Sequence, residues 1–347
     1  MHKQTKNNGI SSPFLLVVGI IVATFFMVLL YVDHKKKNAL QQAQKVYAAL
    51  DRYRVTYDID ARGIGMPIDT ISTSIIGIDQ CVQNIQHFVD RNQQISMLLV
   101  GFPFKSANQE KKVNGFLPDM AERKSLEYVQ HMLDDIKKVY VPGARMLIFC
   151  DGILFAQLFG IPLEHVVAYE RALKLLSKDL PDITIFSSED MMRQHNLKSH
   201  EDIIAHIDQY EPNDAAFRSE LKQLPETALK RIALDLDHTH GRKLLEKNSL
   251  EEIVTQLLSR EARLRSYIAK NFSGADFFRL SVRYTTDVSQ KFGIKLSPSS
   301  DITPFHGVMV QDGDTWSIRF KKDIDTQSYI YDQTLINGRK YGYYKAK

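Results

Sequence analysis

Residues 101–123 read GFPFKSANQEKKVNGFLPDMAER, and this stretch decides how the chain is organised. It follows a short apolar run at 95–102 and leads into a segment with helical apolar spacing, which predicts a helix over 118–140. A buried strand, a loop and an amphipathic helix in this order are typical of an α/β protein with a parallel sheet. The loop is rich in charge, so it is either a solvated connection or the rim of a site.

The same alternation continues along the chain. RMLIFC and ITIF predict further buried strands at 145–150 and 183–186, with a helix between them at 163–179. The segment 188–270 has mostly helical patterns, and four strand-like runs that we expect to pair antiparallel follow it: FFRLSVRY, FGIKLS, HGVMVQ and TWSIRFK. The sequence therefore predicts a Rossmann-like α/β fold, with a mostly parallel sheet, flanking helices and a β-rich C-terminal part.

The N-terminus predicts a membrane anchor. PFLLVVGIIVATFFMVLLYV carries no charge for about twenty residues, which is long enough to cross a bilayer as one helix. Lysines are more frequent after this run than before it, which favours a single-pass protein with a cytoplasmic body. The predicted parts are a tail at 1–12, a transmembrane helix at 13–32, a helical stalk and linker at 33–68, and a folded domain at 69–347.

Composition excludes several classes of protein. Charged residues make up 25% and hydrophobic residues 44% of the 347 residues, which is typical of a globular chain. The net charge of +4 and the lack of a basic stripe argue against nucleic-acid binding. The two cysteines, Cys81 and Cys150, lie far apart and form no motif with metal-ligand spacing, so we expect buried, reduced thiols and no metal site.

Two predicted strand ends carry chemically active side chains. Lys105 follows the first strand and Asp151 the second, and ligands of open α/β sheets bind beyond the carboxyl ends of the strands. In the first turn of the next helix, Asp119 and Glu122 suit helix capping, and Asp119 and Arg123 are spaced to form an ion pair. Two interpretations stay open here: helix capping alone, or a carboxylate that is held ready to bind an ammonium group.

Further candidates lie downstream. His306 is held between Pro304 and Gly307 at the start of a strand-like run. Arg279 and Arg283 are four residues apart on another run, so both side chains share a face and could bind one anion, with Lys295 on the neighbouring run. The alternative is a solvated sheet face.

A short motif suggests a different enzyme class. LDLDHTHG at 234–241 resembles the DxDxT signature of haloacid-dehalogenase-type phosphatases, with Asp235 as nucleophile and Asp237 as acid/base. It lies in a polar helical region rather than after a solid strand, so this function is a remote alternative. Metal binding by His238 and His240 is equally remote.

Several segments together resemble one known family. Residues 100–123 are similar to the FPxKSxNxxKVxGxLPDMAE signature of the pyoverdine/dityrosine biosynthesis family, the isocyanide (isonitrile) synthases. PGARMLIFCDGILFAQLFGI at 142–161 resembles that family's PGAxxxIxSDGxxFxDLxG stretch. FFRLSVRYTTDVSQKFGIKL and TPFHGV resemble its RLSIH…K.GI.L and PWHGV elements, so the resemblance covers about 95–320.

The resemblance implies a catalytic domain at 69–347 that works without a cofactor. The amine of an aromatic L-amino acid, Tyr or Trp, would condense with the ketone of ribulose 5-phosphate, and fragmentation of the sugar would leave an isocyanide. Family members often work beside an iron/2-oxoglutarate oxygenase, which is a further expected partner. The implied roles are phosphate binding or ketone polarisation by Lys105, Arg279 and Lys295, orientation of the ammonium group by Asp119 and Glu122, and proton exchange by Asp151 and His306.

Three positions differ from the family pattern. Cys150 replaces a serine, Ile153 follows Gly152 where the family often has a bulky or basic residue, and Arg283 replaces a histidine. A guanidinium cannot act as a base near neutral pH, unlike an imidazole. The competing interpretation is therefore a membrane-tethered, non-catalytic family member that binds a metabolite or a partner protein.

Overall fold

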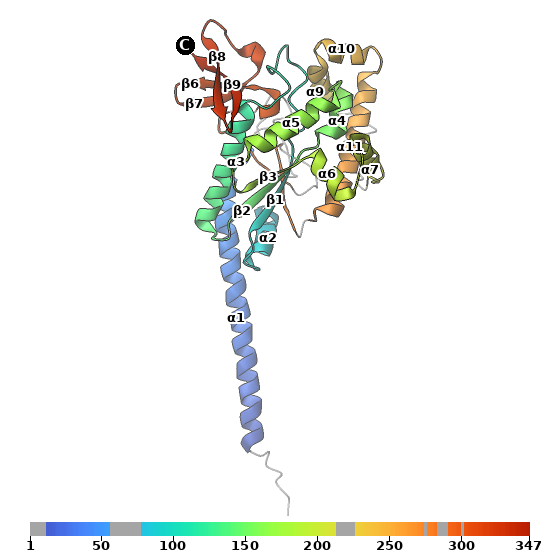
Figure 1. The fold of residues 1–347 in the computed structure, drawn as a ribbon. Helices are drawn as coiled ribbons and strands as arrows, with labels where there is room; N and C mark the ends of the chain where they lie inside the picture. The colour runs from blue at the N-terminus through green and yellow to red at the C-terminus, as the bar shows by residue number, and fades with distance from the viewer. Residues whose placement is uncertain (1–11, 56–77, 213–225, 274–275, 283–290, 300–301) are drawn as a thin grey trace, which may run out of the picture.

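A five-stranded parallel sheet forms the centre of the molecule (Figure 1). The computed structural model describes residues 12–55, 78–212, 226–273, 276–282, 291–299 and 302–347. The strand order is β3-β2-β1-β4-β5, and each neighbouring pair is parallel. The strands are β1 (Ile95–Val100), β2 (Ala144–Phe149), β3 (Ile183–Phe186), β4 (Phe278–Ser281) and β5 (Phe292–Gly293).

Near-continuous apolar sequence explains why β1 and β2 lie in the middle. ISMLLV and ARMLIF have apolar side chains on both faces, which suits a strand covered by helices on each side. Met97 and Leu99 point into one core and Leu98 into the other. The predicted α/β fold with a parallel sheet and flanking helices is confirmed.

Helices cover both faces of the sheet. The core on the Met97 side includes residues of α1 (Ser12–Asp51), α2 (Ile78–Val89) and α3 (Met120–Val139). The core on the Leu98 side includes residues of α4, α6, α7, α9 and α11, and α5 contributes to both cores. These helices span Gly152–Phe155, Ser188–His195, His200–Asp208, Glu226–Leu236, Leu250–Asn271 and, for α5, Leu163–Leu176; η3 (Ala156–Phe159) and α10 (Thr239–Leu245) connect them.

The C-terminal part forms a second sheet of order β7-β6-β9-β8 beside α3 (Figure 1). Its strands are β6 (Val308–Asp312), β7 (Thr315–Arg319), β8 (Tyr329–Ile336) and β9 (Arg339–Ala346), with η4 (Pro304–His306) before it and η5 (Lys321–Asp323) within it. The antiparallel pairing expected for all four strand-like runs is wrong for two of them. FFRLSVRY and FGIKLS contribute β4 and β5, which extend the parallel sheet on the other side of β1.

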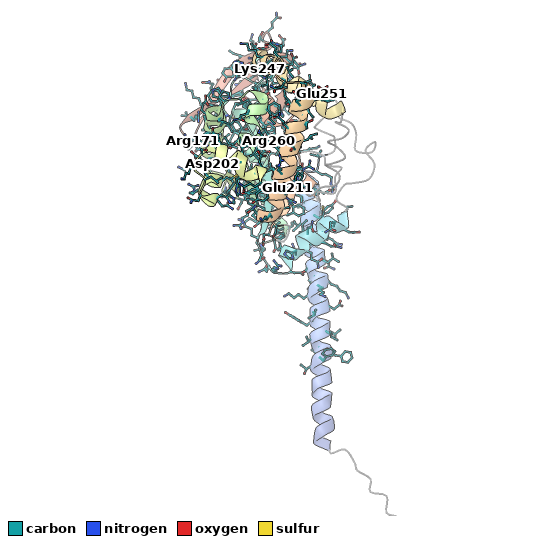
Figure 2. All side chains as sticks on the ribbon, turned by 90° about the vertical axis from the view of Figure 1, so that its right-hand side faces the viewer. Arg171, Asp202, Glu211, Lys247, Glu251 and Arg260 are labelled. Carbon is teal, nitrogen blue, oxygen red and sulfur yellow. The ribbon has the colours of Figure 1, made fainter. Side chains whose placement is uncertain are left out.

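Helix α1 joins two parts that the sequence suggested were separate. It runs for 40 residues through the predicted anchor at 13–32 and most of the predicted stalk. Its last turns, including Val46 and Leu50, are buried in the core, and Val55, which follows the helix, donates a backbone hydrogen bond to the carbonyl of Gly293 in β5. Figures 1 and 2 show the first half of α1 projecting from the body. Among the described residues, no helix meets the length and apolarity needed to span a membrane.

Two unusual backbone positions fix the loops that follow β1 and β2. Phe102 has a positive φ of 55° although it is a fully buried aromatic residue. Such strain persists where the surrounding structure determines it, often at functional sites. Gly152, at the start of α4, packs so closely on the β1 loop that a Cβ atom there would overlap the carbonyl oxygen of Pro103. The two strand-end loops therefore lie in backbone contact.

This contact makes a first prediction. Gly152→Ala forces a methyl group into the backbone of Pro103, and we expect a loss of about 3 kcal/mol in the free energy of unfolding, which overpacking produces at its upper range. The matched control is Gly115→Ala, because the space around Gly115 is open. Urea unfolding followed by circular dichroism measures both variants. Equal midpoints would show that the loops are not in contact.

Candidate functional site

One buried ammonium group ties together the loop after β1, the first turn of α3 and η4. The Nζ atom of Lys105 lies 3.0 and 2.8 Å from the two carboxylate oxygens of Glu122 and 3.0 Å from Oδ2 of Asp119. It also donates a 3.0 Å hydrogen bond to the carbonyl of Pro304. The hydroxyl of Tyr169 on α5 donates to Glu122 at 3.2 Å. We call Lys105, Asp119, Glu122 and Tyr169 the lysine cluster.

Burial controls the charge of this cluster. The side chains of Lys105 and Glu122 are both 0% exposed. Burial tends to lower the pKa of Lys105, but the charges of Asp119 and Glu122 outweigh it and raise this pKa above its ordinary value. Burial raises the pKa of Glu122 to about 8, and the like charge of Asp119 adds to this effect while Lys105 opposes it. The ammonium group is thus held charged, and the two carboxyl groups compete for it.

These contacts occupy the hydrogen-bond donors of Lys105. An ammonium group has three donors, and Lys105 directs them at two carboxylates and a carbonyl. Asp119 and Glu122 also form a capping box at the start of α3, in which Asp119 accepts from the Ala121 N–H at 2.7 Å. The capping interpretation of the two carboxylates describes this geometry. The roles implied for the three residues in binding phosphate and ammonium stay predictions.

Arg123 points away from the cluster. Its guanidinium binds both carboxylate oxygens of Asp179 at 2.6 and 2.8 Å, and it also donates to Glu127 at 2.7 Å and to the carbonyl of Leu176. The ion pair predicted between Asp119 and Arg123 is replaced by these contacts. Arg123 therefore fastens α3 to the end of α5, which stabilises the fold.

Asp151 lies directly beyond β2, as predicted, and is half-buried. Burial raises the pKa of the Cys150 thiol well above its ordinary value. The nearby charges of Glu170, on α5, and of Asp151 raise it further. Glu170 accepts from the Ser188 N–H at 2.9 Å at the start of α6. Its other oxygen, Oε1, is buried and makes no hydrogen bond within the described part of the chain. Burial raises the pKa of Glu170 to about 7.

A second buried ion pair connects the β1 loop to α9 and η4. Lys112 Nζ pairs with Asp235 Oδ1, and both side chains are less than one tenth exposed. His306 Nε2 lies 3.9 Å from the same carboxylate oxygen, and His306 Nδ1 lies 2.7 Å from the hydroxyl oxygen of Thr303. We call Lys112, Asp235, His306 and Thr303 the histidine cluster. The two clusters adjoin, because Lys105 binds the carbonyl of Pro304 in η4.

The histidine cluster corrects two interpretations. The interpretation of the charged loop as a solvated connection does not hold for Lys112, which is buried against Asp235. Its neighbour Lys111 pairs with Asp237 at the surface. Asp235 lies in the last turn of helix α9 rather than at the end of a strand. A phosphatase that uses Asp235 and Asp237 would need the strand-end context, so the structure gives this alternative no support.

The remaining candidates lie on the strands beyond β1. Arg279 is in the middle of β4, opposite Leu98 of β1, and is half-buried. Lys295 follows β5, also half-buried, and its backbone N–H binds the carbonyl of Tyr53. Arg283 lies outside the described residues. In the described ranges, no group of three or more His, Cys, Asp or Glu side chains could hold a metal ion.

Sequence reasoning missed Lys112, Tyr169 and Glu170, and it considered Asp235 only as a phosphatase nucleophile. One signal was present for Lys112, since the family signature has a lysine followed by valine, and Lys112 precedes Val113. The other three lie in helices with ordinary amphipathic patterns, and their partners are distant in sequence. Arg260 of α11 (Figure 2) is a similar case: it donates to the carbonyl of Leu154 at 2.7 Å and so holds α4 in place.

Comparison with known proteins identifies the family of this chain. The family model of the pyoverdine/dityrosine biosynthesis proteins matches residues 85–331, which make up most of this chain. The chain belongs to the pyoverdine/dityrosine biosynthesis protein family. The matched residues include both clusters and the ends of all five parallel strands.

Two curated relatives of this family member carry names that describe a reaction. An L-tryptophan isonitrile synthase of Fischerella ambigua is 28% identical over 269 residues, which is 71% of this chain and 76% of the relative. An L-tyrosine isonitrile synthase of Pseudomonas aeruginosa is 28% identical over 255 residues, 69% of this chain and 76% of the relative. The crystal structure of the PvcA protein from Pseudomonas aeruginosa matches with a TM-score of 0.70 at 25% identity, over 88% of this chain and all of that one.

The lysine cluster makes a second prediction. Lys105→Met leaves the buried carboxyl group of Glu122 and the partly buried carboxylate of Asp119 without their cation, and we expect a loss of about 3–5 kcal/mol in the free energy of unfolding. Lys111→Met is the matched control: Lys111 and Asp237 are 45% and 43% exposed, so we expect a loss of less than about 1 kcal/mol. Chemical denaturation of both variants gives the comparison. Similar losses in the two would contradict the assigned role of Lys105.

Glu170 makes a third prediction, on pH. Its pKa is about 7 in the folded chain and near the ordinary value of 4.5 when unfolded, so the folded state binds the extra proton between these values. Glu170 thus contributes stability that is complete below about pH 4.5 and is lost as the pH rises to 7, by up to about 3 kcal/mol. We expect Glu170→Gln to flatten this part of the stability curve. Glu251→Gln, at an exposed position in the first turn of α11, is the control and should leave the slope unchanged.

Proposed function

We propose that this chain is an isocyanide synthase that condenses the amine of an aromatic L-amino acid, Tyr or Trp, with the ketone of ribulose 5-phosphate. Fragmentation of the sugar then leaves the nitrogen bound to a single carbon. The observation that supports this proposal is the similarity to isonitrile synthases named for tryptophan and for tyrosine, each over more than two thirds of both chains.

The geometry agrees with such a task at the carboxyl ends of the strands. Proton exchange needs groups that are held in place yet reachable, and His306 is 22% exposed between Thr303 and Asp235. Asp151, half-buried beyond β2, is the second candidate for proton exchange. Arg279 and Lys295 are the candidate cations for the sugar phosphate, since Lys105 is fully occupied. The reaction as proposed uses no cofactor.

The product would pass to a further enzyme, and an iron/2-oxoglutarate oxygenase is the expected partner. The competing function is a non-catalytic family member that binds a metabolite. Retention of Asp151 and His306 favours the enzyme, while Cys150, Ile153 and Arg283 are the positions that differ from the family pattern.

The test is direct. Purified protein is incubated with ribulose 5-phosphate and either L-tyrosine or L-tryptophan, and mass spectrometry detects the isocyanide. We expect product from one of the two amino acids, and a loss of about 100-fold or more in kcat for His306→Gln, the usual contribution of a general acid or base. His240→Gln, an exposed histidine on α10, is the control. A folded wild-type protein that converts neither amino acid would overturn the proposal.

A further inference from the structure

We propose that Asp235 is a positioning residue for His306: it orients the imidazole and stabilises its protonated form during the reaction. This inference rests on the proposed function for its kinetic consequence, because it assumes that His306 exchanges protons with the substrate. The placement of Asp235 beside His306 does not depend on that assumption. Asp235 comes from helix α9, outside the segments that resemble the family's motifs, yet it is buried beside the TPFHGV element.

The two nitrogens of His306 have different surroundings. Nδ1 is 2.7 Å from Thr303 Oγ1, and this hydrogen bond fixes the orientation of the ring in either tautomer, because a hydroxyl can donate or accept. Nε2 faces Asp235 Oδ1 at 3.9 Å, which is beyond hydrogen-bond distance but within the range of strong charge interaction. Nε2 is therefore the nitrogen at which a gained proton would meet a carboxylate.

The third member, Lys112, keeps Asp235 ionised. A carboxylate as buried as Asp235 is costly unless a cation accompanies it, and Lys112 supplies that cation from the β1 loop. The ring of Phe320 lies 5.7 Å from the Lys112 ammonium on its other side. Backbone bonds hold the loop, since Lys321 N–H donates to the Lys112 carbonyl at 3.1 Å and Ser106 N–H to the Phe305 carbonyl at 2.8 Å. Asp235 thus has a fixed position from which to act on His306.

The alternative role for Asp235 is purely structural: it would neutralise the buried charge of Lys112 and have no effect on His306. A double variant separates the two roles. Lys112→Gln with Asp235→Asn removes both charges at nearly constant volume, so no unpaired buried ion remains. If Asp235 serves only Lys112, this variant turns over like the wild type. If Asp235 acts on His306, turnover stays low although the fold is restored.

The experiment compares four proteins with the wild type: Asp235→Asn, Asp235→Glu, the double variant, and Asp237→Asn as matched control. Asp237 lies two residues further on in surface pairs with Lys111 and Arg242, so its variant should keep wild-type activity. We expect kcat to fall by about 10-fold or more in Asp235→Asn and in the double variant, with partial rescue in Asp235→Glu. In Asp235→Asn, the acid limb of the pH–rate profile should move to lower pH, because the imidazolium loses its carboxylate.

The position of the acid limb of the pH–rate profile depends on the charged groups that face His306 from the elements packed against it. In the described ranges they are Asp235 on α9 and Lys112 on the β1 loop, with Lys105 held at the adjacent Pro304 carbonyl.

A second readout needs no turnover: the NMR titration midpoint of the His306 imidazole should fall in Asp235→Asn and stay unchanged in Asp237→Asn. Wild-type turnover in the double variant, or an unmoved midpoint in Asp235→Asn, overturns the inference. A wild-type protein without activity overturns the proposed function instead, and the NMR titration still decides the role of Asp235.

Discussion

The Lys105 ammonium group is the constraint on which the arrangement of this site depends. A fully buried cation is tolerated only when acceptors surround it, and its acceptors come from α3 and from η4, which lies almost two hundred residues further along the chain. A single atom therefore fixes the positions of the β1 loop, the start of α3 and the segment that carries His306. The strained Phe102 and the glycine contact at Pro103 belong to the same junction, because both shape the loop that delivers the lysine.

The site combines segments that resemble the family's motifs with one residue from the helical region. The β1 loop, the β2 end and η4 are the segments in which the sequence resembles the family most closely. Asp235 comes from α9, outside those segments, and it reaches the same place by pairing with Lys112 of the β1 loop.

The sequence allowed the central strands and most flanking helices to be predicted, because long apolar runs and helical spacing are local properties. β3 was predicted at its observed bounds, and α3 within two residues. The pairing of β4 and β5 with the parallel sheet was missed, because the local sequence of a strand does not determine which sheet edge it joins. The fates of Lys111 and Lys112 were equally hidden. They are neighbours of identical chemistry, and only partners more than one hundred residues away make one a surface ion pair and the other a buried one.

Helix α1 has a mechanical consequence. Its last turns are packed in the core, and residues 24–38 are exposed along a stretch of about 22 Å, at 1.5 Å per residue. A helix clamped at one end behaves as a stiff lever rather than a tether. Whatever holds its outer end would therefore set both the distance and the orientation of the folded body.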